Sequence, residues 1–183
     1  FIIPRFNPKQ MELRQEKKIV ANKLVGKDFE NVLEVGCQLG ESLLAIQKKF
    51  PDKKLVGVDL YKPLITEGKL VTGLDLRVGN AFDLRFQDKE FDVVFTNAFL
   101  CMLEPSQIGE ALKEIIRVAK KYIILVELDA MGTEGPPTQI RTRANWVEMF
   151  KGFGLQATKE KISANIWAVS PWLQYGYVYE VIL

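Results

Sequence analysis

The 183 residues contain no histidine, and this absence removes several classes of enzyme at once. Histidine is the usual general base, proton shuttle and metal ligand near neutral pH. Ser-His and Cys-His nucleophilic catalysis within this sequence are therefore excluded, and a zinc hydrolase would need a carboxylate cluster that the sequence does not show. Cysteine is scarce as well, because Cys37 and Cys101 cannot build a disulfide framework and form no metal-knuckle spacing. We expect two reduced thiols and no metal site.

Long apolar runs and an excess of one charge are also missing. No stretch approaches the roughly 20 apolar residues that span a bilayer, and the opening "FIIPRFNP" is too short and proline-rich for a signal sequence. Lys and Arg number 25 against 23 Asp and Glu, and the basic pairs are scattered. These features predict a cytoplasmic protein with no membrane segment and no nucleic-acid-binding stripe. The composition, 48% hydrophobic, is that of one globular domain, and it leaves the oligomeric state open.

What is present is an alternation of strand and helix patterns. Short apolar runs predict strands at 31–36, 54–59, 75–79, 91–97 and 122–128. Amphipathic patterns predict helices at 11–24, 41–50, 62–72 and 105–120. After a Gly/Pro-rich loop at 129–139, the sequence predicts a helix with a core stripe of Trp146, Met149, Phe150 and Phe153, then strands near 155–162 and 172–183. This order predicts an α/β, doubly wound, mostly parallel sheet with helices on both faces, whose ligands bind at the carboxyl ends of the strands.

The stretch "NVLEVGCQLGES" at 31–42 places two glycines directly after a buried strand. Gly36 and Gly40 can take a positive φ or admit a ligand against the backbone, and the helix that follows offers unpaired N–H groups. Asp59 closes the second strand, 23 residues beyond Gly36, where a carboxylate can accept both hydroxyls of a ribose. Four consecutive predicted strands end in polar residues, and in a parallel sheet these carboxyl ends meet at one edge. We therefore predict a nucleoside ligand at that edge.

Together these stretches resemble the class I S-adenosylmethionine-dependent methyltransferases, in particular the small-domain, type 11-like group. "VLEVGCQLGES" is similar to the family's first motif, "GVDLYKP" to its second, and "RVGNAFDLRFQDKEFDVVFTNAFLCML" to its third and fourth. "EALKEIIRVAKKYIILVELD" is similar to the helix and strand that follow. The resemblance implies a seven-stranded, Rossmann-like methyltransferase fold that ends in an antiparallel strand pair. It also implies S-adenosylmethionine as cofactor and a small-molecule acceptor.

The resemblance further implies the organisation of the chain and the roles of single residues. It divides one domain into an N-terminal helical cap (1–28), a cofactor-binding core (29–129) and a substrate-side region (130–183). Glu34 would lie beneath the amino-acid end of the cofactor, Asp59 would hold its ribose, and Asn80 would receive the exocyclic amine of its adenine. The other positions implied around the cofactor are Gly36, Cys37, Gly40, Leu60, Ala81, Phe82, Asn97 and Ala98.

Three departures from the family pattern bear on these roles. Gln38 stands where the family usually has another glycine, so the turn there must avoid a positive φ or accept strain. Asn80 replaces a common Asp and can bind the amine only with its carbonyl oxygen turned inward. Cys101 and Met102 occupy positions where family members often have a His pair.

The sequence assigns no catalytic residue. A sulfonium methyl is already activated, so the protein has mainly to align the acceptor and exclude water. If a hydroxyl acceptor needs a base, the candidates are Glu127, Asp129 and Glu104. Arg141 and Arg143 favour a small anionic acceptor, although surface arginines often contribute nothing measurable.

Several simpler interpretations stay open. Both cysteines are more often small core residues than nucleophiles, and Asn97 can be an ordinary turn former. Gln38 and the modest size of the chain leave open a catalytically weak cofactor-binding module or a partner subunit. A nicotinamide-dependent dehydrogenase is a distant alternative, because Gly36-x-x-x-Gly40 lacks the G-x-G-x-x-G spacing.

Overall fold

A computed structural model of the chain describes residues 13–129, 144–167 and 172–183. Its seven-stranded sheet has the order β3-β2-β1-β4-β5-β7-β6, with β1 to β5 parallel and β7 antiparallel to both β5 and β6. The strands are β1 (Asn31–Val35), β2 (Lys54–Asp59), β3 (Asp75–Val78), β4 (Phe91–Asn97), β5 (Ala119–Leu128), β6 (Ala157–Lys161) and β7 (Gly176–Ile182). The predicted doubly wound sheet and its C-terminal antiparallel pair are confirmed.

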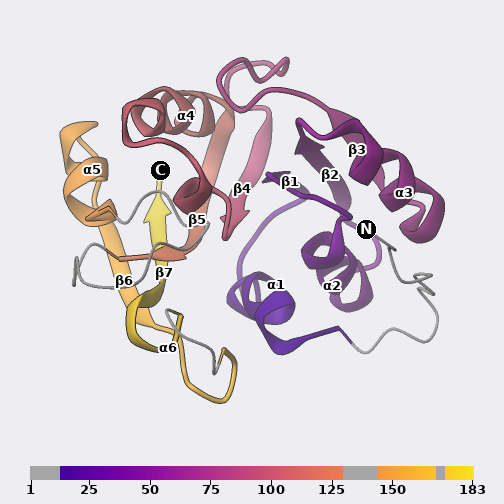
Figure 1. Cartoon of the computed structure of the whole chain (residues 1–183), viewed down its shortest axis with the longest axis horizontal. Helices are drawn as coiled ribbons and strands as arrows, with labels where there is room; N and C mark the ends of the chain where they lie inside the picture. Colours follow the sequence, from indigo (N-terminus) through magenta and orange to yellow (C-terminus); the bar gives the residue numbers. More distant parts are fainter. Residues whose placement is uncertain (1–12, 130–143, 168–171) are drawn as a thin grey trace.

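Helices cover both faces of this sheet (Figure 1). The apolar side chains of α1 (Ile19–Lys23), α2 (Glu41–Lys49) and α3 (Lys62–Thr72) belong to the core on one face. Those of α4 (Pro105–Val118) and α5 (Trp146–Gly152) belong to the core on the other. Three short helical segments complete the described chain: η1 (Gln15–Lys18), η2 (Leu100–Met102) and α6 (Trp172–Tyr175).

The start of helix α4 is determined by its local sequence, and its end by the pairing of strand β5 with β4. Pro105 occupies the first turn, where its missing N–H costs nothing, and Glu104 with Gln107 forms a capping box. The buried stripe of the helix includes Ile108, Leu112 and Ile115. The helix ends at Val118, two residues before the predicted end, because Ala119 extends to pair with Phe91.

The C-terminal third differs from the sequence prediction in two places. Phe153, predicted to belong to the core stripe of a helix, follows the last turn of α5 and is 36% exposed. Trp146 and Phe150 are fully buried, as predicted. Residues 172–175, predicted as part of a strand, form the helical turn α6, and β7 begins only at Gly176.

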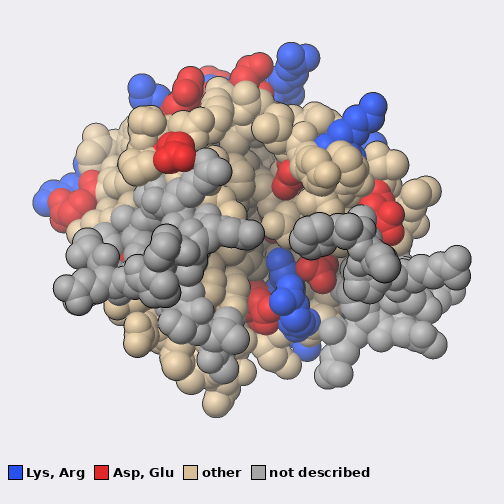
Figure 2. All heavy atoms as spheres, in the orientation of Figure 1, with Lys and Arg blue, Asp and Glu red and all other residues tan. Residues whose placement is uncertain are grey.

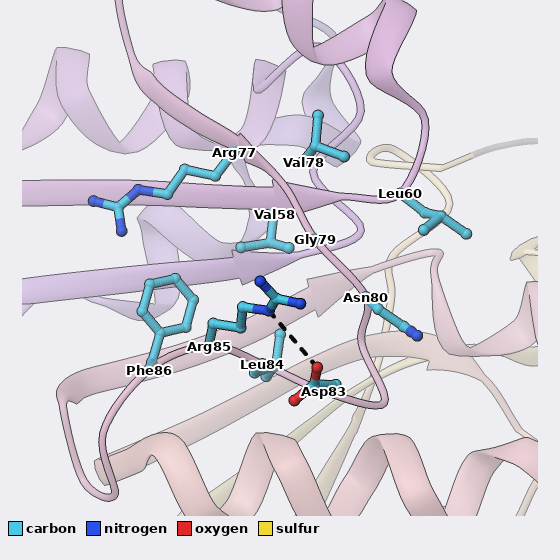
Figure 3. Close-up of a pocket in the computed structure, with 10 residues that line it drawn as sticks. All are labelled: Val58, Leu60, Arg77, Val78, Gly79, Asn80, Asp83, Leu84, Arg85 and Phe86. Atoms are coloured by element: carbon cyan, nitrogen blue, oxygen red, sulfur yellow. Dashed lines mark ion pairs between the residues drawn. The ribbon is translucent and has the colours of Figure 1, made fainter.

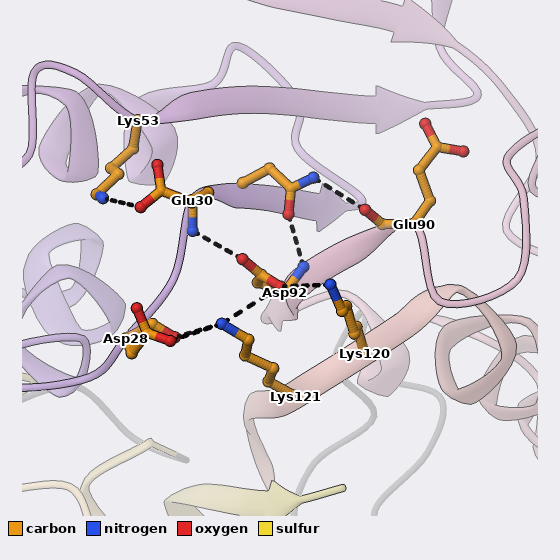
Figure 4. A network of polar contacts seen from close by, with 8 residues as sticks. Asp28, Glu30, Lys53, Glu90, Asp92, Lys120 and Lys121 are labelled. Carbon is orange, nitrogen blue, oxygen red and sulfur yellow. Dashed lines mark hydrogen bonds and ion pairs between the residues drawn. The ribbon is translucent and has the colours of Figure 1, made fainter.

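Charged side chains of both signs are interspersed over the face shown in Figure 2. A separate group of charged side chains forms a network at the amino ends of the strands (Figure 4). Asp92, at the start of β4, accepts a hydrogen bond from the Glu30 backbone N–H at 2.8 Å and lies 3.7 Å from the Lys121 ammonium. Lys121 also pairs with Asp28 at 2.8 Å. Because Asp92 is only 6% exposed, this carboxylate joins the starts of β1, β4 and β5 in a partly dry environment.

We predict that Asp92→Ala lowers the free energy of unfolding by about 1–3 kcal/mol, the cost of losing a hydrogen bond to a buried charged group. Asp92→Asn keeps an oxygen for the Glu30 N–H and should lose less. Asp52→Ala, an exposed change in the turn before β2, is the control. Urea denaturation measures all three variants. Equal stability of Asp92→Ala and Asp52→Ala would contradict a structural role for the network.

Candidate functional site

The loop between β1 and α2 bends through three left-handed residues. Gly36, Gln38 and Gly40 have φ values of 79°, 50° and 80°. Gln38 therefore accepts the strained conformation rather than avoiding it, at the position where the sequence departs from the family glycine. The Gly36 and Cys37 N–H groups both donate to the Val58 carbonyl, at 2.8 and 3.0 Å, and so fix the loop to the end of β2.

Position 36 requires glycine because the Phe99 side chain packs against it. A Cβ atom added there would lie 2.3 Å from Cγ and Cδ2 of Phe99, the residue before η2. At Gly40 an added Cβ would meet the methyl groups of Leu76 at 3.1 Å, a tight but less severe contact. The phenyl ring of Phe99 therefore packs directly on the glycine loop.

Asp59 ties the second strand end to the same loop. One carboxylate oxygen accepts from the Gln38 N–H at 3.0 Å, and the other accepts from the Tyr61 N–H at 2.9 Å. Asp59 is half-buried, and Leu60 beside it is 73% exposed. Each oxygen keeps a further lone pair, so the carboxylate can still accept hydroxyl donors from the solvent side.

The third strand end forms a tight turn. Asn80 is exposed, and its carbonyl oxygen accepts from the Phe82 N–H at 3.0 Å. This bond occupies one lone pair of the oxygen that the family role would turn toward an amine. Ala81 is buried and Phe82 is half-buried.

Two adjoining cavities follow this edge. The larger, of about 440 Å³, lies at the outer end of β2 and β3 (Figure 3), within the range of roughly 300–1,000 Å³ typical of ligand sites. Arg85 and Asp83 both line it and form an exposed ion pair, with 3.7 Å between Nε and Oδ2. The smaller, of about 70 Å³, reaches Gly36 and Phe99. The two cavities share Val58, Leu60, Gly79 and Asn80, and together they form one crevice along the ends of β1, β2 and β3.

Beside the glycine loop lies a buried polar group with unmet hydrogen-bonding capacity. Glu34 and Asn97 are 2% and 6% exposed, and both contact Ser42. The Asn97 amide donates to the Ser42 hydroxyl at 3.3 Å and to the Glu16 carbonyl at 3.1 Å. Glu34 Oε2 and Asn97 Oδ1, however, have no hydrogen-bond partner among the described residues.

The electrostatics of Glu34 reflect this burial. Loss of solvent raises the pKa of Glu34 to about 8, against the opposing charge of Lys17 and the Ser42 hydrogen bond. A buried acceptor pair that lacks donors is costly unless a ligand supplies them. The two oxygens suit a ligand group with several N–H donors and a positive charge.

Glu127, a candidate base from the sequence, accepts hydrogen bonds on both carboxylate oxygens. Its fully buried carboxylate accepts from the Thr96 hydroxyl and from the backbone N–H groups of Phe99, Leu100 and Cys101, at 2.8–3.1 Å. Burial raises the pKa of Glu127, and the backbone donors oppose the shift. These bonds hold the turn after β4, in which Ala98 has a φ of 58°.

The other two candidate bases also have partners. Asp129 accepts from the Tyr179 hydroxyl and pairs with Lys159 at 2.5 Å, and it is 2% exposed. Glu104 belongs to the capping box of α4. In the described part of the chain, none of the three carboxylates is left without a structural partner.

The cysteines behave as core residues. Cys37 and Cys101 are 4% and 1% exposed, and burial raises the pKa of both thiols. The Cys37 sulfur lies beside Gly57 of β2, and Cys37 is not among the residues that line the crevice. No cluster of three or more metal-ligating side chains occurs within residues 13–129, 144–167 and 172–183.

The strand ends thus form a candidate nucleoside-binding site on a doubly wound α/β domain. A carboxylate that can accept ribose hydroxyls lies at the end of β2, a crevice borders it, and unpaired acceptors lie beside the glycine loop. These features fit a ligand with a nucleoside at one end and an ammonium group at the other.

Comparison with known proteins finds methyltransferases. Residues 32–122 match the family model described as "Methyltransferase domain". The chain is 34% identical over 89 residues to a malonyl-[acyl-carrier protein] O-methyltransferase of Calditerrivibrio nitroreducens, covering 49% of this chain and 34% of that protein. It is 32% identical over 99 residues to a demethylmenaquinone methyltransferase of Symbiobacterium thermophilum, covering 50% and 39%.

The fold extends the likeness over the whole chain. A crystal structure of a Pyrococcus horikoshii protein superposes with a TM-score of 0.74 at 18% identity, covering 99% of this chain and 96% of that one. The chain belongs to the class I S-adenosylmethionine-dependent methyltransferase family, whose cofactor is S-adenosylmethionine. It spans less than half the length of the curated relatives it matches. None of the described helices combines the length and the apolar character that crossing a membrane requires.

We predict that Gly36→Ala is more destabilising than Gly73→Ala, although both glycines have a left-handed φ. Gly73 has open space around a new Cβ, so its change should cost only the backbone term of about 1–2 kcal/mol. Displacing Phe99 should add about 1–3 kcal/mol at Gly36. Urea denaturation gives both values, and Phe99→Ala in the Gly36→Ala background should recover the added cost. Equal losses at the two glycines would show that the Phe99 contact yields without strain.

Proposed function

We propose that the protein transfers a methyl group from S-adenosylmethionine to a small-molecule acceptor. The observation that carries the proposal is the pair of buried, unpaired oxygens, Glu34 Oε2 and Asn97 Oδ1, beside the glycine loop. An ammonium group supplies the missing donors and the positive charge together. With Asp59 at the end of β2, the site can hold both the amino-acid end and the ribose of the cofactor.

The residues of the chain contribute binding and alignment. When bound, the sulfonium cofactor supplies an activated methyl group. Asp59 would accept the ribose hydroxyls, Leu60, Ala81 and Phe82 would border the adenine, and the backbone at Asn97 and Ala98 would line the methionine end. The Asn80 carbonyl oxygen would use its remaining lone pair for the adenine amine. Cys37 and Gly40 would act by shaping the loop. Such a reaction needs alignment and exclusion of water, and it needs no base if the acceptor is already anionic.

We further propose a small anionic acceptor. The malonyl group named in one relative carries a carboxylate, whereas the demethylmenaquinone named in another does not. Two lysines at the end of β6 favour the anionic choice. The ammonium groups of Lys159 and Lys161 lie 4.2 and 4.5 Å from the centre of the Tyr177 ring, at the same edge of the sheet as the cofactor crevice. Burial and the neighbouring Lys159 lower the pKa of Lys161, whereas Asp129 raises it. The Lys161 ammonium donates to the Gln174 carbonyl at 2.5 Å, and Lys159 pairs with Asp129, so an anionic acceptor would add to these contacts.

A catalytically weak cofactor-binding module is the second candidate. It is favoured by the structural partners of Glu127, Asp129 and Glu104, because each of these three candidate bases for a hydroxyl acceptor already holds a part of the fold. Methyl transfer from labelled S-adenosylmethionine to a panel of small carboxylic acids and neutral analogues separates the two. Binding of the cofactor with no transfer to any member would favour the module.

We predict that Asp59→Ala weakens S-adenosylhomocysteine binding by about 1.5–3 kcal/mol for each charge-assisted hydrogen bond lost, less than additively. Asp59→Asn keeps the shape and one acceptor, so it should lose less. Asp52→Ala, far from the crevice, should bind like the wild type. Titration calorimetry measures the dissociation constants. An unchanged constant for Asp59→Ala would remove Asp59 from the site, and a wild type that binds neither cofactor nor product would refute the methyltransferase proposal.

We predict that replacing both Arg141 and Arg143 with Ala raises the KM for an anionic acceptor while the cofactor dissociation constant stays the same. These arginines lie outside the described residues, and the expectation rests on their charge and their place after the Gly/Pro-rich stretch 129–139. Loss of uniform binding changes KM and leaves kcat unchanged. Steady-state kinetics on the best acid of the panel provide the test. If the preferred acceptor is neutral, or if KM is unchanged, the anionic acceptor is wrong.

A further inference from the structure

A ligand that binds both halves of the candidate site has to cross the end of β1. The crevice lies on the face of the sheet that α4 covers, because its lining residues Val58 and Ala81 belong to the core on that face. The acceptor pair, Glu34 Oε2 and Asn97 Oδ1, lies on the opposite face, where Asn97 bonds to a residue of α2, and neither residue of the pair lines the crevice. Gly36 directly follows β1 and lines the smaller cavity, so the crossing point lies at this glycine.

The Phe99 side chain occupies this crossing point. The three atoms nearest to a Cβ built on Gly36 all belong to Phe99, and the nearest lies at 2.3 Å. Phe82 and Leu103 line the same smaller cavity, but neither supplies any of these atoms. The cavity holds only about 70 Å³, far below the roughly 300–1,000 Å³ of ligand sites. A ligand that passes over Gly36 therefore has to displace the Phe99 ring.

The backbone of Phe99 is fixed, so the movement falls to its side chain. The Phe99 N–H donates to Glu127 at 3.0 Å, and the Phe99 carbonyl accepts from the Met102 N–H at 2.9 Å. Phe99 is half-buried, in contrast to the fully buried Phe95 of β4. A half-buried side chain can change its rotamer without opening a cavity in the core. The ring can thus leave Gly36 while the turn after β4 keeps its shape.

A permanent wall is the alternative role for Phe99. A ring that stays in place beside a bound nucleoside adds contact area, and its removal weakens every ligand that touches it. The structure favours a movable ring, because the ring covers the crossing at Gly36 and leaves a cavity too small for a cofactor. Leu103 lines the same cavity away from these contacts, so it provides the reference for a wall.

We propose that Phe99 is a side-chain gate across the end of β1. Its ring lies on Gly36 until a ligand that spans Asp59 and the acceptor pair takes that place. The inference rests on the proposed function and adds a gating step to it. A nucleoside that reaches only the crevice leaves the ring where it is. The gate therefore slows the association of the longer ligand alone and lowers its apparent affinity by the fraction of molecules in which the gate is open.

Two ligands test the gate by their binding to the whole chain. S-adenosylhomocysteine spans both halves of the site, whereas adenosine reaches only the crevice. Phe99→Ala should raise the association rate constant of S-adenosylhomocysteine at least fivefold, measured by surface plasmon resonance. The dissociation constant of adenosine, measured by titration calorimetry, should stay within twofold of the wild type. Phe99→Leu, which keeps an apolar side chain without the ring, should give a smaller increase, and Phe99→Trp should slow association.

Leu103→Ala is the matched control. It removes an apolar side chain from the same cavity but leaves the Phe99 ring on Gly36, so it should change the binding of the two ligands alike.

The position of the ring can be measured separately from binding strength. An aromatic ring shifts the magnetic resonances of nuclei packed against it, so the amide signal of Gly36 reports on Phe99. Phe99→Ala and the addition of S-adenosylhomocysteine to the wild type should move this signal in the same direction. The shift caused by the ligand itself is obtained with Phe99→Ala and subtracted. Adenosine should leave the contribution of the ring in place.

The outcomes separate the gate from the proposed function. If the wild type binds S-adenosylhomocysteine and Phe99→Ala weakens both ligands, Phe99 is a wall, and the proposed function stands without a gate. If Phe99→Ala and Phe99→Leu leave the association rate unchanged, the gate is equally wrong. If the wild type binds neither S-adenosylhomocysteine nor S-adenosylmethionine, the proposed function fails and the gate fails with it.

Discussion

The cluster of donors around the Glu127 carboxylate is the contact on which the geometry of the site depends. A buried carboxylate is costly unless it is hydrogen-bonded, and here three consecutive backbone N–H groups and the Thr96 hydroxyl meet that demand. To deliver those N–H groups, the chain turns sharply after β4 and holds Ala98 in the left-handed region. The same turn places the Phe99 ring on Gly36. The buried Glu127 carboxylate therefore also fixes the residue whose ring packs on the glycine loop.

Glu34 and Glu127 show what burial does to two acids on one sheet. Both are almost fully enclosed, and burial raises the pKa of each. Glu127 is surrounded by donors from its own chain, whereas Glu34 keeps one oxygen without a partner, as does the neighbouring Asn97. Among the described residues these two oxygens are the buried side-chain acceptors left open, and both residues contact Ser42, so the pair suits a cationic group.

Much of the fold could be predicted because its signals are local. The apolar runs that became β1, β2 and β4 and the stripe of α4 depend on neighbouring residues and their periodicity. The exposed Phe153 and the helical turn at residues 172–175 were not predicted. An apolar pattern does not show where packing against other elements, or pairing with a neighbouring strand, begins and ends. The early start of β5 has the same origin, since Ala119 is extended by its pairing with Phe91.

The candidate site divides in the same way. The sequence by itself determined which strands end in polar residues and where glycine follows a strand, because both depend on position along the chain. Only the tertiary structure decided that donors surround the Glu127 carboxylate, and that one oxygen of Glu34 has no hydrogen-bond partner among the described residues. Those outcomes depend on hydrogen-bonding groups from η1, α2 and the turn after β4, which are distant in sequence and meet only when the sheet is assembled. Hydrogen-bond satisfaction of a buried group is a property of its packed surroundings, and no local pattern encodes it.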